Sequence, residues 1–160
     1  MILNQVQPFH RSMLQEVLDT FDLRYLVDKD GDFVVLMRQE GLSGLAILHF
    51  VVSGVRGEVF SIMAHLENLP PFPEQALLHK VNAWNVKHRW PRAFVKGGRV
   101  YLDFHVDLEA GIHPGLLRDM VGRVVAGVGQ FVAWMEGKDL GELFLHLLGS
   151  FNPGEESLEC

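Results

Sequence analysis

The sequence predicts an α+β domain in which one antiparallel sheet is faced by helices on one side. Apolar residues recur at three- and four-residue spacing over 12–21 and 115–135, which is typical of helices with one apolar face. Short alternating segments between them are separated by Asp- and Gly-rich turns, which favour antiparallel strands. The two-residue Gly97-Gly98 turn marks a hairpin. The predicted order is helix, four strands, helix, two strands, helix.

The first half of the chain is predicted to hold one helix and a meander of about four strands. The helix covers 12–21, and the strands cover 24–28, 33–39, 45–52 and 58–66. The turn from Asp28 to Asp32 superficially resembles a calcium loop. Such a loop would need a glycine at Phe33 and a glutamate at Gln39, so a plain hairpin turn is favoured.

A proline-bounded helix is predicted over 73–90. Proline suits the first helical position, and the residue before Pro91 is disfavoured in a helix. Trp84 is either a core residue, which is favoured, or a recognition anchor for a partner. Asn82 and Asn85 lie one turn apart, and two interpretations stay open. They bind a ligand or partner, or they hydrogen-bond to backbone where the helix meets the sheet, which the need to satisfy buried amides favours.

The register of the predicted hairpin over 92–108 can be assigned residue by residue. A two-residue turn places Arg92 opposite Asp103 and Phe94 opposite Tyr101. Alternation sends both pairs to the face away from the core. An aromatic pair and an opposite-charge pair each contribute about 0.2–1 kcal/mol.

The last long helix, predicted over 115–135, carries a stripe of small residues. Its members are Gly122, Ala126, Gly129 and Ala133. Each interior glycine costs about 1 kcal/mol relative to alanine, so close packing along this line is expected. The stripe packs against the protein's own sheet or first helix, or it forms a subunit interface that a twofold dimer would use twice.

Composition bounds the class of protein. With 160 residues, 48% of them hydrophobic and 21% charged, the chain fits one globular domain. A net charge of -6 argues against nucleic-acid binding. The mean hydropathy of +0.14 suggests that a partner or a second copy covers apolar surface. The N-terminus lacks a signal-peptide pattern and no apolar run reaches the roughly 20 residues of a membrane span, so we expect a cytoplasmic protein without a membrane partner.

No catalytic constellation is apparent. Asp103, His105 and Asp107 share one strand face and could coordinate a divalent metal. Two-residue spacing holds such side chains about 7 Å apart, so an ordinary polar face with Asp103 paired to Arg92 is favoured. Phosphate-binding glycine loops and nucleophile-elbow serines are missing from the sequence. We therefore predict no enzyme activity, no cofactor and no bound metal.

The chain resembles the YbjN-like family of putative bacterial sensory transduction regulators. The features that carry the resemblance are Asn82-Ala83-Trp84-Asn85, Arg92-Ala93-Phe94-Val95, the Gly97-Gly98 turn, Val100-Tyr101-Leu102-Asp103 and Ala110-Gly111-Ile112-His113. The resemblance implies a fold like that of type III secretion chaperones, and a small, often dimeric protein-binding module without known catalysis.

These observations predict one YbjN-like domain over 1–150, with a core over about 12–135 and an added helical segment over 139–149. Residues 151–160 are predicted to be a flexible tail. The expected function is a non-enzymatic, chaperone-like or regulatory module that binds another protein through apolar surface as a homodimer. The alternative is a small-molecule or metal sensor that uses Asp103, His105 and Asp107.

Overall fold

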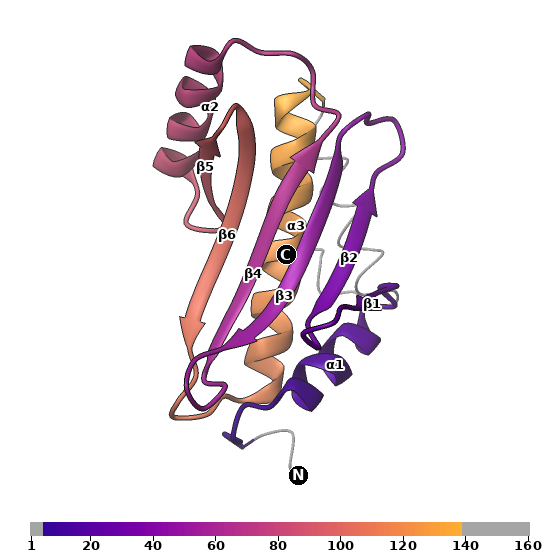
Figure 1. Ribbon diagram of the computed structural model, residues 1–160, viewed down its shortest axis with the longest axis vertical. Coiled ribbons are helices and arrows are strands. Elements are labelled where there is room, and N and C mark those ends of the chain that lie inside the picture. The colour runs from indigo at the N-terminus through magenta and orange to yellow at the C-terminus, as the bar shows by residue number, and fades with distance from the viewer. Residues whose placement is uncertain (1–4, 139–160) are drawn as a thin grey trace, which may run out of the picture.

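A computed structural model describes residues 5–138, and the elements follow the predicted order (Figure 1). The added segment over 139–149 and the tail over 151–160 lie outside the described residues. The helices are α1 (Arg11–Thr20), α2 (Glu74–Lys87) and α3 (Pro114–Met135). The strands are β1 (Leu26–Val27), β2 (Phe33–Arg38), β3 (Leu45–Ser53), β4 (Val59–Glu67), β5 (Arg92–Lys96) and β6 (Arg99–Asp107).

The strands form one antiparallel sheet of six in the order β1-β2-β3-β4-β6-β5. The chain runs through β1 to β4 as a meander and then crosses through α2 to the hairpin, whose second strand pairs with β4. The hairpin register is the predicted one, with Arg92 opposite Asp103 and Phe94 opposite Tyr101. The α+β prediction is therefore confirmed, including the residues that meet across the hairpin.

Two elements, β1 and α2, differ from the predicted bounds by more than one residue. β1 is only Leu26–Val27, because the turn after it closes early: the Asp28 carboxylate accepts hydrogen bonds from the backbone N–H groups of Asp30 and Asp32, at 2.9 and 3.0 Å. α2 ends at Lys87, three residues before the predicted end. His88 is already extended, so the chain turns back early enough for Trp84 Nε1 to donate to the Pro91 carbonyl at 2.9 Å.

Helix α3 lies across one face of the sheet, and α1 packs beside it (Figure 1). The α3 residues Leu117, Val121 and Phe131 are fully buried. Trp84 of α2 meets Phe131 edge-on at a centroid distance of 5.1 Å, which ties α2 to the same layer. The core therefore sits between α3 and the sheet residues that face it. On the three longest strands those residues are Ala46, Leu48, Phe50, Phe60, Ile62, Ala64, Leu66, Val100 and Leu102.

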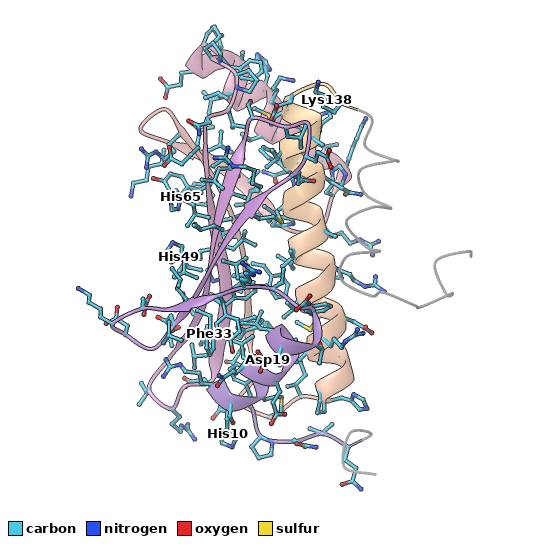
Figure 2. All side chains as sticks on the ribbon, turned by 90° about the vertical axis from the view of Figure 1, so that its right-hand side faces the viewer. His10, Asp19, Phe33, His49, His65 and Lys138 are labelled. Carbon is cyan, nitrogen blue, oxygen red and sulfur yellow. The ribbon has the colours of Figure 1, made fainter. Side chains whose placement is uncertain are left out.

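The other face of the sheet carries no helix among residues 5–138. Figure 2 shows His49 and His65 on this side, directed away from α3. We call this surface the open face, and it consists of the alternate strand residues that point away from the core. Its members on β2 to β6 include Leu36, Ile47, His49, Ser61, Met63, His65, Phe94, Tyr101, Asp103 and His105.

Candidate functional site

A row of apolar and aromatic side chains crosses the open face. The strand register places Leu36 beside Ile47, Ile47 beside His65, His65 beside Tyr101, and Tyr101 beside Phe94. Leu36 is 58% exposed, and Met63 next to the row is 39% exposed. Large apolar side chains gathered on one surface mark a site of interaction more often than scattered ones do.

Rings on and beside this row contact one another. Phe94 and Tyr101 stack with centroids 5.3 Å apart, as the predicted cross-strand pair requires, and the Arg92 guanidinium lies 5.0 Å from the Phe94 centroid. His49 and His65 stack at 5.8 Å. Burial lowers the pKa of His65, the neighbouring His49 and Arg99 lower it further, and Glu67 opposes them. His65 is therefore held toward its neutral form, which suits an apolar contact surface.

A polar network adjoins the row. Arg92 binds both oxygens of Asp103, with Nε donating at 2.8 Å and a terminal nitrogen donating at 2.6 Å. His105 connects Asp103 to Ser61, with Nε2 at 3.1 Å from the carboxylate and Nδ1 at 2.6 Å from the Ser61 hydroxyl. Burial alone would raise the pKa of Asp103, but the hydrogen bonds and charges of Arg92 and His105 outweigh it and lower that pKa.

The set Ser61, His105 and Asp103 has the residue types of a hydrolytic triad, but its surroundings do not suit that chemistry. Ser61 is only 4% exposed and lies on β4, between β3 and β6. Backbone N–H groups of such a strand are used by the neighbouring strands and cannot form an oxyanion hole. We interpret the network as a satisfied polar patch that fixes the Arg92–Asp103 pair. The sequence did not indicate Ser61, because its contact depends on the register between β4 and β6.

The three candidate metal ligands do not form one site: His105 contacts Asp103 at 3.1 Å, but Asp107 does not join them. Asp103 is occupied by Arg92, and Asp107 accepts a hydrogen bond from the Glu109 N–H at 2.9 Å. A cation at Asp103 would have to displace a guanidinium group.

Within the described part of the chain, the one group of three acidic or histidine side chains close enough for a shared ion is Asp28, Asp30 and Asp32, with ligand atoms within 4.8 Å. The hairpin turn accounts for it, since Asp28 caps two turn N–H groups and Asp32 pairs with Arg11 at 3.3 Å.

The residues of the middle-helix motif lie in different environments. Trp84 is 1% exposed and belongs to the core. The Asn85 side chain donates to the Ala93 carbonyl and accepts from the Ala93 N–H, both at 2.9 Å. This is the backbone interpretation. Among the described residues it applies to Asn85 and not to Asn82, although both residues are exposed.

The small-residue stripe on α3 makes contacts inside the protein. Ala126, Gly129 and Ala133 are buried, and a Cβ on Gly122 would come within 3.3 Å of the Phe21 ring. The Gly129 carbonyl also accepts a hydrogen bond from Gln39 at 3.3 Å. These contacts favour intramolecular packing, the first of the two alternatives. A subunit interface along the stripe stays a prediction without support from these contacts.

Comparisons with known proteins give one family. The model of the YbjN family, described as "Putative bacterial sensory transduction regulator", matches residues 10–137. Comparisons with curated proteins and with solved structures give no match, so the chaperone-like fold stays a prediction. Among the described residues, no helix combines the length and the apolar character that crossing a membrane would require.

Proposed function

We propose a function for this chain from the premise that it belongs to the YbjN family of putative bacterial sensory transduction regulators. In this proposal the protein is a cytoplasmic, non-enzymatic regulatory module that binds another protein. Its contact surface is the open face, and the same face also joins two copies as a homodimer.

The observation that carries the proposal is the row from Leu36 to Phe94 on a sheet face without a described helix. A sheet normally buries one face and hydrates the other, and a solvated face is expected to be polar. Here Leu36 and Met63 remain 58% and 39% exposed. Burying these side chains against a partner stabilises the complex by about 25 cal/mol for each Å² of apolar surface removed from water, which favours association.

The alternative, a metal or small-molecule sensor at Asp103, His105 and Asp107, has less support. Arg92 and Ser61 already satisfy Asp103 and His105. A ligand there would have to exchange partners rather than fill an empty site. Thermal unfolding with and without divalent cations tests the alternative, and a rise in melting temperature that Asp103→Asn removes would support it.

The dimer is tested by light scattering on the full chain. Replacing Leu36 and Met63 together by glutamate places two charges on the open face, and we expect the dimer mass to fall to that of a monomer. The matched control replaces Val55 and Leu116, which are 99% and 52% exposed but lie off this face, by glutamate. A dimer mass that survives the open-face change would remove this face from the interface.

Partner binding is tested separately in cells. A photoreactive amino acid at position 36 should crosslink to one discrete partner, whereas the same group at position 55 should not. Equal crosslinking from both positions would mean that the open face is not a specific contact surface. Because the crosslinked product is identified by mass, a second copy and a different protein are told apart.

A further inference from the structure

One edge of the sheet is covered along only part of its length. β5 pairs with β6 from Arg99 to Asp103, but β6 continues to Asp107. Beyond Asp103, β6 has β4 on one side, and no strand of the described residues lies on the other. Figure 1 shows β6 continuing downward past β5 to its arrowhead. We call residues 104–107 the bare edge.

The backbone groups that point outward at the bare edge can be assigned. In an antiparallel ladder, the N–H and C=O of alternate residues point to the same neighbour. Ala93 directs its groups away from β6, toward Asn85, so its neighbour Arg92 is in the hydrogen-bonded pair with Asp103. By alternation from Asp103, the groups of His105 and Asp107 point outward, and no backbone hydrogen bond among the described residues uses them.

A hollow of about 410 Å³ adjoins the bare edge. Its lining consists of Arg89, Trp90, Arg92, Asp103, Phe104 and His105. Trp90 is 40% exposed and meets Phe104 edge-on at 6.3 Å, so an aromatic wall stands beside the free backbone groups. The volume of the hollow is in the range that accommodates a small group or a few side chains.

The hollow carries positive charge in a protein whose net charge is -6. Asp103 neutralises Arg92, which leaves the exposed Arg89 as the uncompensated charge. The next acidic side chain along β6 is Asp107, two residues beyond His105 and so about 7 Å away from it. The hollow lies at one end of the bare edge. Its positive charge therefore favours an acidic group on a ligand that binds there.

We propose that the bare edge of β6 binds an extended segment of a partner protein as an added strand, with an acidic side chain of that segment held at Arg89. The outward N–H and C=O groups of His105 and Asp107 supply the backbone hydrogen bonds, and the hollow selects the side chain. Strand addition to an open edge derives its affinity from the backbone and its specificity from such pockets. This site is separate from the open-face row and does not depend on it.

The test measures fluorescence anisotropy of labelled nonapeptides with the full chain. The peptides share the sequence Ser-Thr-Val-Xaa-Val-Xaa-Val-Thr-Ser, in which Xaa is aspartate, asparagine or lysine. We expect the aspartate peptide to bind at least about tenfold more tightly than the lysine peptide, a difference of roughly 1.4 kcal/mol. Arg89→Glu should reverse this order. The matched control Lys96→Glu makes the same charge change at an exposed position on β5, at the far end of the hairpin, and should leave the order unchanged.

A second arm tests strand pairing itself. Methylating alternate backbone nitrogens of the aspartate peptide removes the donors that one strand edge would use, and binding should be lost for one of the two methylation registers. Equal binding of both methylated peptides, equal binding of the aspartate and lysine peptides, or no binding of any peptide would overturn the proposal. Binding that develops only after removal of residues 151–160 would also overturn it, since the occupant would then be this chain's own acidic end.

Discussion

The two faces of the sheet are built from the same strands, but α3 covers one face and no described helix covers the other. On β4, Phe60 and Ile62 face α3 and are at most 1% exposed, while Met63 on the open face is 39% exposed. The covered face is held by packing inside the chain. The open face combines an apolar row with a satisfied polar network, and it holds its shape without a described helix. Residues of the covered face therefore maintain the fold, whereas residues of the open face are available for contact.

The largest effect should distinguish the two faces directly. Phe60→Ala removes a fully buried ring that meets Phe9 at 5.7 Å, and we expect the free energy of unfolding to fall by about 3–5 kcal/mol. Met63→Ala on the same strand should change it by no more than about 0.5 kcal/mol. Urea unfolding of both variants measures the difference, and similar losses would mean that the open face is covered within the monomer.

A smaller loss is expected where the open face is polar. Asp103→Asn leaves Arg92 and His105 without their carboxylate, and we expect a loss of about 1–3 kcal/mol at neutral pH. Asp107→Asn, on the same strand and face but exposed, is the matched control and should have little effect.

The loss at Asp103 should also depend on pH. The pKa of Asp103 lies below its ordinary value of 3.8, so its ionised form favours the folded state. The stabilisation is complete above that value and is lost as the pH falls below it, through the lowered pKa. Unfolding at pH 7 and at pH 3 should show the difference between wild type and Asp103→Asn shrinking. A constant difference would mean that the ion pair contributes nothing.

Asn85 should have an intermediate effect at the edge of the sheet. Asn85→Ala leaves the N–H and C=O of Ala93 without their two hydrogen bonds, and a loss of about 1–2 kcal/mol is expected. The exposed Asn82→Ala is the control from the same helix. Because an uncovered strand edge recruits other chains, the Asn85 variant should also aggregate sooner on heating. A loss as small as that of Asn82→Ala would show that water replaces the Asn85 amide at no cost.

Much of this architecture could be read from the sequence because it depends on local signals. The Gly97-Gly98 turn fixes the hairpin register, and with it the Arg92–Asp103 and Phe94–Tyr101 pairs. Contacts between strands far apart in the chain could not be read in this way. Ser61 meets His105, and His49 meets His65, only because β4 lies between β3 and β6. The bare edge likewise depends on how far β6 extends past β5, which no single turn specifies.

The smallest effect on stability should come from His65. Its pH dependence should show whether the open face disfavours a charged ring or only requires a ring of that size. Its pKa is lowered, first by burial and then by His49 and Arg99, so the neutral ring favours the folded state. The unfolded chain takes up the proton first as the pH falls below the ordinary value of 6.5, and stability should decline from there through the lowered pKa. His65→Phe keeps a ring in the row and should remove this decline, whereas His10→Phe should keep it. Urea midpoints between pH 7.5 and pH 5 measure it. If the His65 variant declines as wild type does, the open face tolerates a buried charge, and apolar contact would not be what defines it.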